Sequence, residues 1–86
     1  MNIIEDRFLL YWRAFYNAHE SLKFFSMSHP DRKELLDEIR KTRLSHAKKL
    51  SDLCVSLGDE KCRDLIGGVA YCHLRQNMKE VNHEID

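Results

Sequence analysis

Apolar residues recur at steps of three and four along the first third of the chain, from Ile3 to Met27. Steps of this size place side chains on one stripe of an α-helix, and their average of about 3.5 residues is the spacing of helical bundles and coiled coils. The stripe consists of Ile4, Phe8, Tyr11, Phe15, Ala18, Leu22 and Phe25. The pattern predicts a helix over about residues 3–27 that runs nearly parallel or antiparallel to its neighbours.

The same segment is also apolar on the side that a simple bundle helix exposes. This second set of residues is Ile3, Leu9, Leu10, Trp12, Tyr16 and Phe24. A helix that is hydrophobic nearly all round is usually buried nearly all round. A short chain has few other elements to cover it, so we expect part of this surface to meet another chain. The alternative is that neighbouring helices of the same monomer wrap it.

Pro30 marks the boundary between this helix and the next. The residue before a proline avoids the helical region and proline is favoured in the first turn, so a second helix is expected over about residues 31–57. Gly58 follows its last apolar residue and is typical of a helix C-terminus. Two positions in the middle of its apolar face are polar, Arg43 and His46. A small rotation of the helix would keep both at the rim of the core, and we expect that placement.

A third helix is expected over about residues 60–83, with Asp59 as its N-cap. Gly67 and Gly68 lie inside its apolar pattern and cost roughly 1 kcal/mol each relative to alanine. Glycines there indicate either the close approach of a neighbouring group or a break in the helix. We expect the close approach of a bulky ring from the first helix. A break after Ile66, which would give two helices, is the alternative.

Connections of about three residues make consecutive helices antiparallel neighbours. The sequence therefore predicts an all-α fold: an up-down-up antiparallel three-helix bundle in a single domain over residues 1–86, associating into a larger dimeric helical bundle. The charge balance agrees with self-association, because 14 Lys and Arg residues match 14 Asp and Glu residues. A net charge near zero does little to keep copies apart.

The cysteine count and the apolar runs bear on the compartment. Three cysteines are an odd number, which fits poorly with the paired disulfides of secreted proteins, so a cytoplasmic protein is expected. The longest apolar run is the five residues from Phe8 to Trp12, whereas a membrane-spanning helix needs ~20. Glu5, Asp6 and Arg7 interrupt the apolar N-terminal stretch, unlike a secretory signal. We expect no membrane partner.

A cluster of cations lies within ten residues of the expected second helix: Arg40, Lys41, Arg43, Lys48 and Lys49. Cations that neutralise phosphates supply most of the non-specific affinity for nucleic acid. Nucleic-acid binding through these five residues is therefore an alternative function. The competing interpretation is a solvated helix face whose charges pair with acids elsewhere in this neutral chain.

Arg40 and His46 also form an R-x5-H sequence, which resembles the arginine-to-histidine spacing of HEPN-type ribonucleases. The resemblance covers seven residues. It implies a dimer that brings two such motifs together to cut RNA, with Arg40 and His46 as the catalytic pair. Lys41 stands where that family commonly has a small polar or acidic residue, and the chain is short for the fold.

The sequence offers the residue types of a zinc site in Cys54, Cys62, Cys72 and His73. No C-x2-C pair is present to orient two ligands from one loop, so we predict no metal site and interpret the cysteines as small buried hydrophobes. The chain has no phosphate-binding glycine loop, nucleophile elbow or pair of catalytic carboxylates. We therefore predict no cofactor and no enzymatic activity.

These patterns favour a small non-enzymatic helical module for protein–protein interaction or regulation. Aromatic side chains dominate the anchors of protein interfaces, so the aromatic-rich first helix is the expected contact surface. The predicted partner is a second copy of the chain or a larger protein. The predicted contact residues are Leu9, Tyr11, Trp12, Tyr16 and Phe24.

Overall fold

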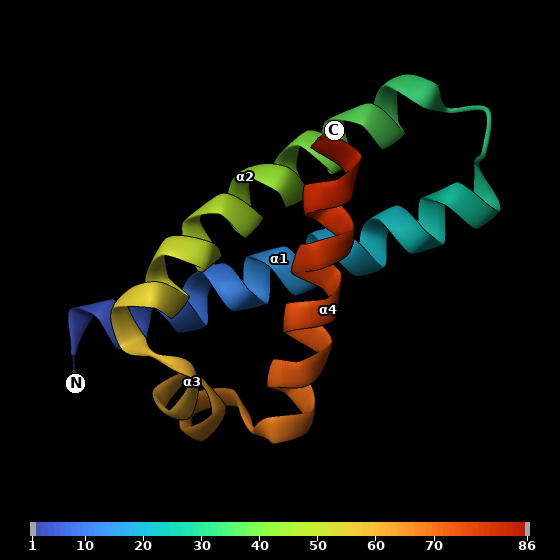
Figure 1. Cartoon of the computed structure of the whole chain (residues 1–86). Coiled ribbons are helices and arrows are strands. Elements are labelled where there is room, and N and C mark those ends of the chain that lie inside the picture. Colours follow the sequence, from blue (N-terminus) through green and yellow to red (C-terminus); the bar gives the residue numbers. More distant parts are fainter. Residues whose placement is uncertain (1, 86) are drawn as a thin grey trace.

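The computed structural model describes the backbone of residues 2–85 and the side chains of residues 2–81, and this part of the chain is all-helical (Figure 1). Its helices are α1 (Ile3–Ser28), α2 (Lys33–Leu57), α3 (Asp59–Ile66) and α4 (Gly68–Ile85). The all-α prediction is confirmed. The described residues form four helices rather than the three expected.

The two long helices begin and end close to the predicted positions. Asn2 caps α1, because its side chain accepts a hydrogen bond of 2.9 Å from the backbone N–H of Ile4. The second helix begins at Lys33, two residues later than expected. Pro30 and the residue after it form a turn, closed by the Arg32 N–H donating to the carbonyl of His29 at 3.1 Å. This turn includes Asp31, where the pattern had placed the start of the helix.

Single glycines join the remaining helices. Gly58 ends α2 with φ +86° and Gly67 ends α3 with φ +92°, a backbone region that other residues rarely adopt. The Gly67 N–H donates to the carbonyl of Arg63 at 2.7 Å, while its own carbonyl accepts from Tyr71 at 3.0 Å. Gly67 therefore closes one helix and opens the next within one residue.

The expectation that a ring packs closely against Gly67 and Gly68 is wrong. A Cβ atom built at either position would meet no atom within 4 Å. Gly67 serves the backbone instead, since it has the positive φ that turns the chain between α3 and α4. The break after Ile66, which was the alternative, is what the structure contains.

Figure 1 shows α1 and α2 running antiparallel side by side, with α3 at the end where α1 begins and α2 ends. From α3, α4 leads back across the pair. The core lies where these helices meet and consists of Phe8, Phe15, Ala47, Leu50, Cys54, Cys62, Tyr71, Leu74, Met78 and Val81. Each large side chain buried there stabilises the fold by about 1.5–3 kcal/mol.

Two polar contacts fix α3 against its neighbours. Lys61 of α3 pairs with Glu5 of α1 at 2.8 Å, and its ammonium holds the pKa of the Glu5 carboxyl below the usual range. The Tyr71 hydroxyl of α4 donates to the Asp59 carboxylate in the first turn of α3. Burial, followed by this hydrogen bond, raises the pKa of Tyr71 to about 12. The short helix is thereby tied to both α1 and α4.

The polar middle of α2 turns toward α1, not away from it. Arg43 is only 4% exposed, so its predicted position at the rim is wrong. Its guanidinium donates to Nδ1 of His19 on α1 at 3.3 Å, which gives the buried charge an acceptor from the facing helix. His46 is half-buried, with its ring 5.8 Å from that of Tyr11. No described helix is long and apolar enough to cross a membrane.

Candidate partner-binding groove between α1 and α4

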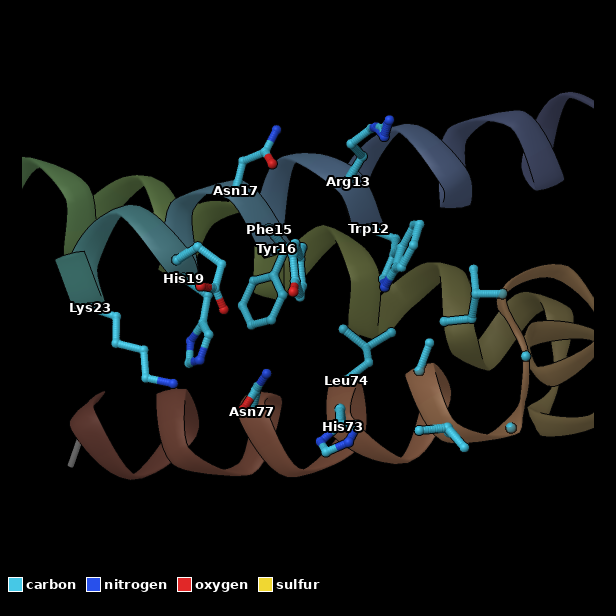
Figure 2. Close-up of a pocket in the computed structure, with 16 residues that line it drawn as sticks. Trp12, Arg13, Phe15, Tyr16, Asn17, His19, Lys23, His73, Leu74 and Asn77 are labelled. Carbon is cyan, nitrogen blue, oxygen red and sulfur yellow. The ribbon is translucent and has the colours of Figure 1, made fainter.

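A cleft of about 930 Å³ opens between α1 and α4. It arises because α4 packs more closely against α2 than against α1. The α1 wall includes Trp12, Tyr16, His19 and Lys23, and the α4 wall includes Val69, His73, Leu74 and Asn77. Figure 2 shows Trp12, Tyr16 and His19 pointing from α1 toward α4, while Arg13 and Asn17 point away from it. We call this cleft the α1–α4 groove.

The α1 wall is aromatic because residues four positions apart share one helix face. Trp12 and Tyr16 are such a pair, with ring centroids 6.4 Å apart. Phe15 and His19 are a second pair, stacked at 6.3 Å. Trp12 packs partly against the core, whereas Tyr16 is 51% exposed. The wall therefore has one firmly held ring and one that solvent reaches.

The base of the groove consists of buried residues, whereas its α4 wall includes exposed ones. Phe15 and Leu74 are both buried in the core and line its base. On the α4 side Val69 is 76% exposed and His73 is exposed. Gly67 lines the end of the groove without a side chain, so that end stays open.

His19 sets the electrostatics of the groove wall. Burial lowers the pKa of its ring first, and the nearby Arg43 guanidinium lowers it further, while Glu20 and Glu80 act in the opposite direction. The ring is therefore held neutral and accepts the hydrogen bond from Arg43. The other charged residues along the groove are Arg13, Lys23 and Glu20, two cations and one anion. The groove thus carries a small positive excess.

The predicted contact residues of α1 separate into three groups. Trp12 and Tyr16 line the groove. Leu9 and Tyr11 are partly buried and pack against the core. Phe24 is 61% exposed, lies outside the groove residues, and contacts the Phe25 ring edge-on at 5.1 Å.

The five cations of α2 do not form one exposed basic face. Arg43 is buried, and Arg40 pairs with Asp37 at 3.1 Å. The Lys49 ammonium lies 5.0 Å from the centre of the Tyr11 ring and donates to its hydroxyl at 3.3 Å. Arg40, Lys41, Lys48 and Lys49 are all exposed.

The two residues of the R-x5-H sequence lie apart within the chain. Arg40 is exposed beside Asp37, whereas His46 is half-buried against Tyr11 of α1. A single copy of the chain does not bring their side chains together. Any shared site would need a second copy.

The cysteines also differ from one another. Cys54 and Cys62 are buried as expected and belong to the same core cluster, on either side of the Gly58 turn. Burial is the largest cause that raises the pKa of both, to about 12 for Cys54. Cys72 is exposed, so the prediction that it is buried is wrong. Among the described residues no three His, Cys, Asp or Glu side chains are grouped as metal ligands.

Sequence reasoning missed the α4 wall and His19. Neither Val69 nor His19 is among the contact residues that the pattern predicts. The available signal was the position of His19 four residues after Phe15, which puts both on the same side of α1.

Comparisons with protein-family models, curated proteins and solved structures find no match to this chain.

Proposed function

We propose that this protein is a small non-enzymatic helical module that acts in the cytoplasm by binding a larger protein in the α1–α4 groove. The observation that supports the proposal is an aromatic wall, made of partly buried Trp12 and half-exposed Tyr16, on a groove whose base is already part of the core. Aromatic side chains in preformed pockets are the strongest anchors of protein interfaces. Keeping such rings open to solvent has a functional explanation if a partner covers them.

The dimensions and charge of the groove favour one kind of occupant, an amphipathic helix. The α1 wall from Trp12 to Lys23 extends about 16 Å at ~1.5 Å per residue, which matches about three turns of a bound helix. Binding of an apolar helix face in a hydrophobic groove is a common recognition mode. The positive excess from Arg13 and Lys23 over Glu20 favours acidic residues beside the apolar face of that helix.

A site-specific photo-cross-linker tests the proposal. Introduced at His73, which is exposed on the α4 wall, it should capture one dominant protein species in cells of the native host. The matched control carries the same group at Lys48, which is exposed on α2 outside the groove. Tyr16→Ala should reduce the capture at position 73 because it removes half of the aromatic wall.

The captured segment should map to an amphipathic helix with acidic flanks. Equal cross-linking at positions 73 and 48, or no cross-linked species at position 73, would contradict the proposal. Circular dichroism of each variant should retain the helical content of the unaltered protein, since His73 and Lys48 are exposed.

A further inference from the structure

A second surface of α1 faces away from the core and meets the α1–α4 groove at its rim, where Arg13, Asn17 and Glu20 belong to both. Leu10, Phe24 and Met27 are 65%, 61% and 82% exposed. Polar residues between them are exposed as well, and Figure 2 shows Arg13 and Asn17 pointing away from α4. We call this surface the outer face of α1, defined by Leu10, Arg13, Asn17, Glu20, Phe24 and Met27.

These six residues follow one another at steps of three and four. That spacing is the seam of a coiled coil, which a second helix can follow at a shallow angle over its whole length. From residue 10 to residue 27 the seam is about 26 Å long at ~1.5 Å per residue. The outer face is therefore suited to a long helix, and its chemistry identifies which helix.

A parallel second copy is disfavoured. In that arrangement each residue of the seam faces the same residue of the partner. Arg13 would lie against the partner's Arg13, and Glu20 against the partner's Glu20. Like charges placed opposite each other at an interface disfavour that pairing.

In an antiparallel arrangement with a second copy, each pair of facing residues is complementary. Leu10 faces the partner's Met27, which is an apolar contact. The Arg13 guanidinium faces the partner's Phe24 ring, a cation–π arrangement. The Asn17 amide faces the partner's Glu20 carboxylate, to which it can donate a charge-assisted hydrogen bond. The two-fold symmetry of the dimer repeats each of these residue pairs.

The same chemistry selects the register. A shift of seven residues keeps the seam aligned but changes the pairs. In one direction the shift sets Glu20 against the partner's Leu10, and in the other it sets Glu20 against the partner's Phe24. Either shift desolvates a carboxylate against an apolar side chain or a ring face, which is unfavourable. A net charge of zero also leaves no overall repulsion between copies.

We propose that two copies of this protein pair through the outer face of α1, antiparallel, with Asn17 of each copy opposite the partner's Glu20. This pairing does not use Trp12 or Tyr16, and it shares only Arg13, Asn17 and Glu20 with the rim of the groove. Dimerisation is measured on the chain alone, without a groove ligand, so its outcome is distinguishable from that of binding in the α1–α4 groove.

Charge variants at Asn17 and Glu20 test both the pairing and its register. Asn17→Glu sets one carboxylate against the partner's Glu20, twice per dimer, and should weaken the dimer about tenfold or more. Adding Glu20→Lys to that variant sets opposite charges together and should restore dimerisation. Gln76→Glu, which makes the same charge change at an exposed position of α4, should leave the dissociation constant unchanged.

The dissociation constants are measured by sedimentation equilibrium over a wide range of protein concentration. The proposal is overturned if the unaltered chain stays monomeric up to its solubility limit. It is also overturned if a dimer forms but Asn17→Glu leaves it unchanged, or if the double variant fails to restore it. The cross-linking at position 73 reports on the groove separately, so failure of one proposal is distinguishable from failure of the other.

Discussion

Gly67 and Gly68 are neighbours that should respond to alanine with opposite signs. Gly67 has φ +92° and ψ +154°, a conformation nearly exclusive to glycine, whereas Gly68 begins α4 without a positive φ. A Cβ atom at either position would meet nothing within 4 Å. Because crowding contributes at neither site, the backbone conformation alone decides the effect.

The magnitude follows from two terms. Alanine at position 67 costs about 1–3 kcal/mol of backbone strain, offset by about 0.4–1 kcal/mol because the unfolded chain also loses freedom. At the middle of each range the net destabilisation should be about 1.3 kcal/mol. Gly68→Ala receives the favourable term without the strain, and should stabilise the protein by about 0.4–1 kcal/mol.

Thermal unfolding followed by far-ultraviolet circular dichroism separates the two variants. A difference of 1 kcal/mol moves the Tm of a domain this size by about 4–8 °C, so the two midpoints should lie on opposite sides of the unaltered protein. If Gly67→Ala unfolds at the same temperature as the unaltered protein or higher, Gly67 does not hold a strained turn. The separation of α3 from α4 would then be refuted.

Three further outcomes are expected. Leu50→Ala should destabilise the protein by about 2–5 kcal/mol in urea unfolding, because the side chain is completely buried and its loss leaves a cavity. The free energy of unfolding should fall as the pH drops below about 6.5. The folded protein lowers the pKa of His19, so the unfolded chain binds a proton more readily in this range. His19→Gln should reduce this pH dependence, measured by unfolding across the same range. Cys72 should react first with a thiol reagent under native conditions, since Cys54 and Cys62 are buried thiols whose pKa values are raised; Cys72→Ser should abolish the fast phase.

The long helices were predictable because their signals are local. Asn2 and Pro30 delimit α1, and the four-three spacing identified Phe8 and Phe15, both of which are buried. Periodicity reports which side chains share a helix face, and burial of one face follows from it. The all-α class and the ends of α1 and α2 could therefore be predicted within two residues.

The errors concern properties that depend on other parts of the chain. Gly67 is compatible with tight packing or with a turn, and only its backbone torsion separates the two. Arg43 is buried because α1 offers His19 as an acceptor, a pairing between residues 24 positions apart. The α1–α4 groove exists because α4, redirected at Gly67, packs more closely on α2 than on α1. Sequence periodicity carries no information on that packing.

We propose that the groove between α1 and α4 binds a protein helix, and the fluorescence of Trp12 tests this proposal. Trp12 is the only tryptophan of the chain and lines the groove, so its emission reports on what enters. A peptide with the sequence of the segment cross-linked at position 73 should shift this emission saturably to shorter wavelength. Tyr16→Ala should weaken the binding and Phe24→Ala, outside the groove, should not. Binding of the peptide with no change in Trp12 emission would contradict the claim.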